Sequence, residues 1–167
     1  KHTLHVLPHW TWPGREGQVT PVFVYTDYPS AELFVNGKSQ GKQFKQPYSV
    51  AAGSSNAEKP QLENMELLRR YRLMWDNVKY EPGEIKVVAY KANGEKAEEK
   101  IICTAGKPAK LEAKADRNEI KADGNDLAFV TISLTDKKGN LIPDGSDELT
   151  FDVQGAGSFK AACNGDA

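Results

Sequence analysis

The sequence predicts an all-β protein of two tandem immunoglobulin-like antiparallel β-sandwich domains, the second of them incomplete. Short runs rich in β-branched and aromatic residues alternate between apolar and polar side chains, as half-buried strands do. Turn signals with glycine or proline separate these runs, and almost no stretch has helical periodicity. A glycine–lysine–proline break at 106–108 divides the pattern into two series, so we expect domains at residues 1–105 and 106–167.

In the first domain, strands are expected in chain order at residues 3–9, 18–26, 31–35, 38–44, 69–78, 84–91 and 95–104. Pro21 favours an edge position or a bulge within the second of these strands. Asn36-Gly37 predicts a hairpin, because a type I′ turn needs positive φ at both central residues, and Asn93-Gly94 marks a second hairpin. Residues 46–66 lose the alternation and predict a long loop, with one or two helical turns near 62–68.

The second domain restarts with clean alternation but is short. Its expected strands lie at residues 109–115, 127–135, 149–153 and 158–163. The strand at 127–135 is apolar on both faces, which predicts a central position in its sheet. About seven strands are usual in such a domain. We recognise only four or five, so at least one strand is expected to be missing.

Composition and charge exclude several classes of protein. The chain is 39% hydrophobic and 27% charged, as a folded globular protein is and a disordered one is not. With 22 basic and 23 acidic residues it has no basic field, so nucleic acid is not an expected partner. No apolar run approaches the roughly 18–20 residues of a membrane span. Cys103 and Cys163 end strands of different expected domains, which favours two separate thiols over a bridge.

The most unusual stretch is residues 9–17, His-Trp-Thr-Trp-Pro-Gly-Arg-Glu-Gly, which we call the aromatic loop. Its proline and glycines interrupt regular structure, and two indoles rarely stand free in water without a reason. We therefore predict that His9, Trp10, Trp12 and Arg15 contact either a carbohydrate or a neighbouring domain. The alternative is that both indoles are buried, one in the sandwich and one in an interface.

The sequence nominates no catalytic residue, metal site or cofactor. It has no Gly-rich phosphate loop, HExxH motif or paired CxxC, and no pair of carboxylates stands out among its 23 acids. His5 and His9 share a strand face but lie about 13 Å apart, which is too far for one metal ion. The turns at 123–126 and 164–166 carry oxygen ligands suited to calcium. Neither has the spacing of a known calcium loop, which favours ordinary solvated turns.

Several segments form a succession that is familiar from one family. In the first domain they are HVLPHWTW at 5–12, VFVYT at 22–26, AELFVNGKSQG at 31–41 and YEPGEIKVVAY at 80–90. Together they resemble the domain after the catalytic barrel in glycoside hydrolase family 2 β-galactosidases, especially those of gut Bacteroidetes. The next immunoglobulin-like domain of such enzymes is similar to this chain at residues 105–109, 116–134, 155–157 and 164–166.

The resemblance implies an accessory region without catalytic residues, because the family's acid/base and nucleophile glutamates lie in the barrel, upstream of Lys1. It implies that the partner is the catalytic barrel of the same parent chain, with an oligosaccharide near the aromatic loop. It also implies export to the periplasm or cell surface of a Gram-negative gut bacterium. The family usually has asparagine between the two tryptophans. Thr11 departs from that pattern and puts any contact of this asparagine in doubt.

Two other functions remain open at this point. An independent carbohydrate-binding module would use the same tryptophans to bind a β-linked oligosaccharide. A surface adhesin would consist of further immunoglobulin-like repeats, and the pattern at 123–134 is generic enough to allow it.

Overall fold

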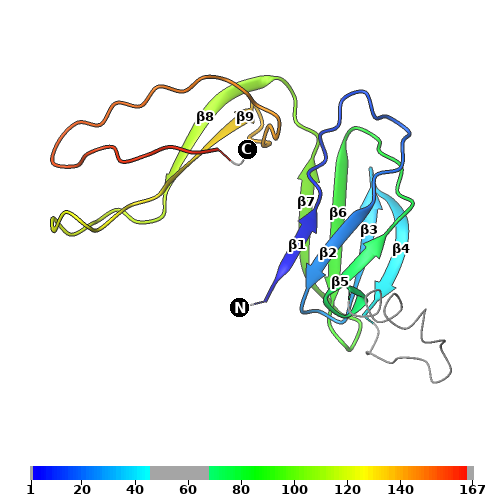
Figure 1. Ribbon diagram of the computed structural model, residues 1–167. Coiled ribbons are helices and arrows are strands. Elements are labelled where there is room, and N and C mark those ends of the chain that lie inside the picture. The colour runs from blue at the N-terminus through cyan, green and yellow to red at the C-terminus, as the bar shows by residue number, and fades with distance from the viewer. Residues whose placement is uncertain (1, 46–67, 165–167) are drawn as a thin grey trace, which may run out of the picture.

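The protein is all-β, and its computed structural model describes residues 2–45 and 68–164. Within these ranges every named element is a strand, and all strand pairs are antiparallel (Figure 1). The strands are β1 (Leu4–Leu7), β2 (Val22–Thr26), β3 (Ser30–Val35), β4 (Lys38–Phe44), β5 (Arg72–Trp75), β6 (Glu84–Tyr90), β7 (Lys96–Cys103), β8 (Pro108–Ala115) and β9 (Val130–Asp136). The described ranges contain no helix with the length and apolar character that a membrane crossing requires.

Strands β1 to β7 form a sandwich of a three-stranded sheet, β1-β2-β5, and a four-stranded sheet, β4-β3-β6-β7. This distribution over two sheets is that of an immunoglobulin-like domain, as the sequence predicts. Alternate residues of both sheets point inward, and Val24, Leu33 and Val87 have no exposed surface. Trp10, from the aromatic loop, is fully buried in the same core.

The turn at 36–37 and the turn before β6 are hydrogen-bonded to each other. Asn36 and Gly37 join β3 to β4 with φ values of 47° and 80°, which confirms the predicted hairpin. The Asn36 side chain donates to the Pro82 carbonyl at 3.2 Å and accepts from the Glu84 amide at 2.8 Å. Gly83 between them has a φ of 136°, and a Cβ there would lie 2.1 Å from Asn36 Oδ1. Glycine is therefore required at position 83 for space as well as for conformation.

Other expected strands are shorter than their sequence pattern. The strand expected at 69–78 begins only at Arg72, because residues 68–71 form one helical turn. The strand expected at 18–26 is reduced to β2 and an isolated bridge between Val19 and Lys79. Pro21, which has no amide hydrogen to donate, separates the two pieces. The whole of the long loop predicted at 46–66 lies outside the described residues, as do the helical turns near 62–68 except for Leu68.

The second series forms much less structure than its sequence pattern predicts. β8 and β9 pair as a separate two-stranded sheet, extended by an isolated bridge between Thr135 and Leu141. The strands expected at 149–153 and 158–163 are not formed, and β9, expected to be central, has β8 as its single strand neighbour among the described residues. These predictions were wrong because a strand also needs a neighbour whose backbone groups complete the ladder. The boundary after residue 105 stays a prediction.

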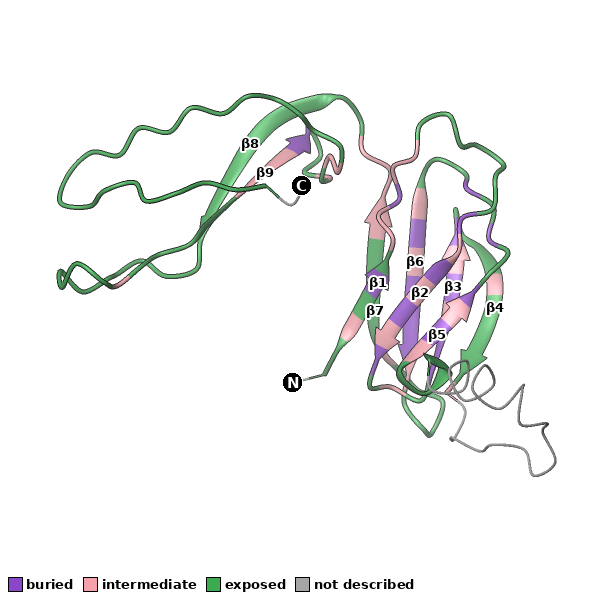
Figure 2. Cartoon of the chain, in the orientation of Figure 1, coloured by how far each residue is buried: buried purple, intermediate pink, exposed green. Residues whose placement is uncertain are grey.

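Burial differs sharply between the two series. In Figure 2 the buried positions concentrate in the sandwich strands, whereas β8 and the segment after β9 are exposed over nearly their whole length. Phe129 beside β9 is 66% exposed, and Phe151 and Phe159 stack on each other with their ring centroids 5.4 Å apart while remaining largely exposed. Among the described residues, the second unit is therefore a two-stranded sheet whose apolar side chains have no opposing layer.

Candidate functional site

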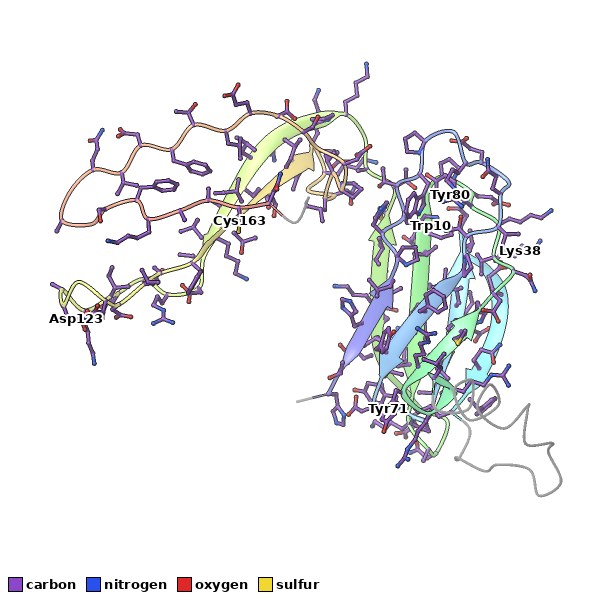
Figure 3. All side chains as sticks on the ribbon, viewed as in Figure 1. Trp10, Lys38, Tyr71, Tyr80, Asp123 and Cys163 are labelled. Carbon is purple, nitrogen blue, oxygen red and sulfur yellow. The ribbon has the colours of Figure 1, made fainter. Side chains whose placement is uncertain are left out.

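The aromatic loop connects β1 to β2 and lies at the end of the sandwich where the chain leaves β7 for β8 (Figure 3). The Arg15 amide donates to the Trp12 carbonyl at 3.1 Å, and the Gln18 amide donates to the Arg15 carbonyl at 3.0 Å, so the loop is folded into successive turns. Gly17 and Gln18 exchange backbone hydrogen bonds with Tyr80 at 2.8 and 2.9 Å. The loop is therefore held in one conformation by the body of the sandwich.

Trp10 serves the core rather than the surface. Its indole has no exposed area, and Nε1 donates to the Glu81 carbonyl at 2.9 Å. The Tyr80 ring meets it edge to face, with centroids 5.2 Å apart and an interplanar angle of 69°. Because the ring is enclosed and its only polar atom is bonded, Trp10 offers no surface to a ligand in this arrangement. For this residue the burial alternative describes the structure.

His9, Trp12 and Arg15 come together at the surface as a second group, which we call the Trp12 cluster. The imidazole of His9 stacks on the Trp12 indole with centroids 4.0 Å apart and planes inclined by 26°. The guanidinium of Arg15 lies 5.2 Å from the indole centroid, within cation–π range. Trp12 Nε1 donates to the His9 carbonyl at 3.0 Å. The structure thus unites three of the four predicted contact residues, and their contact role stays a prediction.

The protonation state of His9 follows from its surroundings. Partial burial lowers the pKa of His9, and the carboxylate of Asp144 offsets part of this effect. His9 Nδ1 accepts a hydrogen bond from the Thr11 amide at 3.3 Å, which requires a free lone pair on that nitrogen. Burial and the hydrogen bond accepted by Nδ1 both favour the neutral imidazole. Stacking, cation–π contact and hydrogen bonding are what this cluster can supply to a partner.

The aromatic loop is also bonded to the linker after β7, which the sequence did not reveal. Thr104 Oγ1 donates to the Trp10 carbonyl at 2.5 Å, and the Ala105 amide donates to Thr11 Oγ1 at 2.9 Å. The Tyr80 hydroxyl accepts from the Trp12 amide at 3.2 Å. Thr11 therefore has a structural role of its own, because its hydroxyl oxygen accepts a hydrogen bond from the linker. No local sequence pattern signals contacts between residues 94 positions apart.

Asp136 anchors the other side of the linker. Its carboxylate accepts from the Gly106 amide at 2.8 Å, from the Lys138 and Asn140 amides at 2.8 and 2.9 Å, and from Asn140 Nδ2 at 2.9 Å. These hydrogen bonds, the one from Gly106 first, hold the pKa of the Asp136 carboxyl well below its usual range. One buried side chain thus joins the linker to the turn after β9.

The polar turn that carried oxygen ligands suited to calcium is an ordinary turn. Asp123 Oδ1 accepts from the Asn125 and Asp126 amides at 2.9 Å each, as in an ordinary turn, and these bonds lower the pKa of the carboxyl. In the part of the chain that the structure describes, no group of three or more His, Cys, Asp or Glu side chains could hold a metal ion. Of the turn at 164–166, the structure describes only Asn164. Cys103 and Cys163 are free thiols.

Comparison with known families accounts for most of the chain. Residues 17–98 match a domain of unknown function, DUF4982, and residues 111–167 match glycoside hydrolase family 2 C-terminal domain 5. A β-galactosidase of Bacteroides ovatus is 41% identical over 166 residues, which are 99% of this chain and 17% of that protein. A putative β-glucuronidase of Formosa agariphila is 31% identical over 156 residues, or 93% of this chain and 13% of that protein.

Solved structures agree with these sequence matches. A glycosyl hydrolase family 2 member from Bacteroides cellulosilyticus is 36% identical, with a TM-score of 0.58 over 81% of this chain and 16% of that one. A β-glycosidase from Bacteroides vulgatus is 29% identical, with a TM-score of 0.62 over 86% of this chain and 15% of that one. The chain thus spans about a sixth of these relatives. It belongs to glycoside hydrolase family 2, as part of the C-terminal region of these enzymes.

Proposed function

We propose that this accessory region buttresses the catalytic barrel of a β-galactosidase-like parent enzyme, and that the Trp12 cluster lies against that barrel near the rim of its sugar site. The observation that carries the proposal is the Trp12 cluster itself, a half-exposed aromatic and cationic surface on a loop held in place by Trp10 and Tyr80. Hydrolysis is assigned to barrel glutamates outside this chain, as the family resemblance implies.

Two observations favour a structural role over independent sugar binding. A sugar-stacking tryptophan presents an open indole face, but His9 stacks on one face of Trp12 with ring centroids 4.0 Å apart, and the Arg15 guanidinium lies 5.2 Å from the indole centroid. Relatives named β-galactosidase and putative β-glucuronidase both match this region over more than nine-tenths of the chain. A region shared by proteins named for different sugars is better suited to supporting a barrel than to choosing its substrate.

The test uses the full-length parent protein. Trp12→Ala should lower both the melting temperature and the hydrolysis rate on a nitrophenyl β-galactoside, because it removes the centre of the proposed contact. Phe34→Ala on the four-stranded sheet is the matched control and should leave the hydrolysis rate unchanged, since Phe34 is a half-buried aromatic on a face away from the loop.

Unchanged melting and turnover in Trp12→Ala would contradict the buttressing role. Loss of oligosaccharide binding with unchanged melting would instead favour the carbohydrate-binding module. Hydrolysis by the 167-residue chain alone would contradict the assignment of catalysis to the barrel. Export to the periplasm or cell surface is part of the same proposal, supported by the family resemblance, and fractionation of the native host with an antibody to this region tests it.

A further inference from the structure

The outward face of the three-stranded sheet carries an unusual set of side chains. Strand pairing places Leu7, Phe23 and Met74 side by side in one row. The adjacent outward row consists of His5, Tyr25 and Arg72. We call these six residues the β1-β2-β5 patch. None of them is Lys, Asp or Glu, the residues that dominate solvated sheet faces and are depleted in protein interfaces.

Arg72 is the one permanent charge in this patch. Its guanidinium lies 4.6 Å from the Phe23 ring centroid and 5.9 Å from that of Tyr25, and Nη1 donates to the Tyr25 hydroxyl at 3.0 Å. No carboxylate pairs with it among the ion pairs of the described residues. Aromatic rings thus hold a cation against the sheet without neutralising it. A planar guanidinium in this setting is suited to receiving a carboxylate from outside.

The outward face of the four-stranded sheet offers an internal comparison. There the Tyr90 hydroxyl donates to Glu32 Oε2 at 3.2 Å, and Lys42 Nζ lies 3.7 Å from the Tyr90 centroid. Lys86 Nζ lies 5.2 Å from the Phe34 centroid. Charges of both signs cover the aromatic rings of this face, as expected where a sheet faces water. The two outward faces of the sandwich therefore differ in charge: the four-stranded sheet carries both acidic and basic side chains, whereas the β1-β2-β5 patch has one permanent charge, that of Arg72.

We propose that another domain of the parent polypeptide docks on the β1-β2-β5 patch and presents a carboxylate to Arg72. This rests on the proposed function and adds the surface through which the buttress acts. The chain spans only 17% and 13% of two of its relatives, so most of such a polypeptide is available as the partner. Leu7 ends β1 two residues before His9, so the patch and the Trp12 cluster are neighbours along the chain.

Residue-level footprinting of the full-length parent protein tests the patch with matched pairs. Phe23 and Phe34 are both half-buried outward aromatics in this structure, as are Tyr25 and Tyr90. Docking should reduce hydroxyl-radical labelling of Phe23 and Tyr25 several-fold relative to Phe34 and Tyr90. Equal labelling within both pairs would overturn the inference. If labelling is equal within both pairs but Trp12 is protected, the docking inference fails and the proposed function stands. If labelling is equal within both pairs and Trp12 is also labelled freely, the inference and the proposed function both fail.

Cross-linking identifies the occupant. A benzophenone side chain placed at Met74 in the parent protein should form cross-links to peptides from outside the 167 residues of this chain, whereas one placed at Phe34 should not. Cross-links from position 74 only to this chain's own residues, or to a second copy in a concentration-dependent manner, would overturn the assignment. Arg72→Glu should reduce the position-74 cross-link several-fold, and Lys86→Glu on the opposite face should leave it unchanged.

Discussion

The sandwich of β1 to β7 and the unit around β8 and β9 have the same kind of sequence but different structures. Both alternate apolar and polar residues between turns. In the sandwich, Val24 and Leu33 have no exposed surface, whereas Leu111 of β8 is 57% exposed. The difference is the opposing layer, which the first series contains and the second lacks within the described residues. The alternation of apolar and polar residues therefore specifies which face of a strand is suited to burial. Whether that face is buried depends on a second sheet packing against it.

The largest expected difference between the two regions comes from truncating an aromatic side chain in each. Trp10→Ala removes a fully buried indole and its bond to Glu81, and should lower the free energy of unfolding by about 3–5 kcal/mol. Phe129→Ala should change it by less than about 0.5 kcal/mol, because Phe129 is already exposed. Urea unfolding of the 167-residue chain measures both. Equal losses would show that the second unit has a core of its own.

A smaller difference is expected between two glycines. Gly83→Ala places a Cβ against Asn36 at a φ of 136° and should cost about 1–3 kcal/mol of unfolding free energy. Gly157→Ala in the second unit meets nothing within 4 Å and should stay within about 0.5 kcal/mol of the original chain. The same urea titration compares them. If Gly83→Ala left the free energy of unfolding unchanged, the turns at 36–37 and 80–83 would be able to move apart without loss of stability.

The smallest effects are expected from acid. Folding lowers the pKa of Asp136, so its carboxylate stabilises the native state fully above the unfolded value of about 3.9. That stabilisation is lost progressively as the pH falls through the folded pKa. Asp136→Asn should therefore flatten the decline of the unfolding midpoint below pH of about 4.

Asp27 in the first sandwich provides the comparison for Asp136. Its pKa is lowered to about 2 by the Thr3 amide and by His2, but both side chains of the His2–Asp27 pair are exposed. Asp27→Asn should therefore change the acid profile less than Asp136→Asn, because solvent screens exposed pairs. Midpoints measured from pH of about 2 to 6 for each variant decide the order, and a larger effect at Asp27 would contradict it.

Local chemistry made the sandwich predictable from the sequence. The Asn36–Gly37 turn is specified by two adjacent residues, and the inward set of β6, Ile85, Val87 and Ala89, follows from a period of two. The missing strands at 149–153 and 158–163 were not predictable, because their patterns contain no information on whether a neighbour is present. Whether such a segment forms a strand depends on a neighbouring backbone with which it can form hydrogen bonds, and the side-chain pattern of the segment does not show whether that neighbour exists.

The candidate site was predicted only in part for a similar reason. The sequence singled out His9, Trp10, Trp12 and Arg15 by their type, but periodicity does not apply within a loop. It therefore could not separate buried Trp10 from half-exposed Trp12. Tyr80, Thr104 and Ala105 come from distant segments, and only the folded sandwich brings them to the aromatic loop.

The bonds of Thr104 and Ala105 to the aromatic loop have a mechanical consequence. The linker to the next unit is not free to move independently of the sandwich. Its first two residues, Thr104 and Ala105, are hydrogen-bonded to the Trp10 carbonyl and to Thr11 Oγ1. Asp136 then grips the same segment one residue later, at Gly106. The path by which the chain enters β8 is consequently tied to the conformation of the aromatic loop at Trp10 and Thr11, as well as to Asp136.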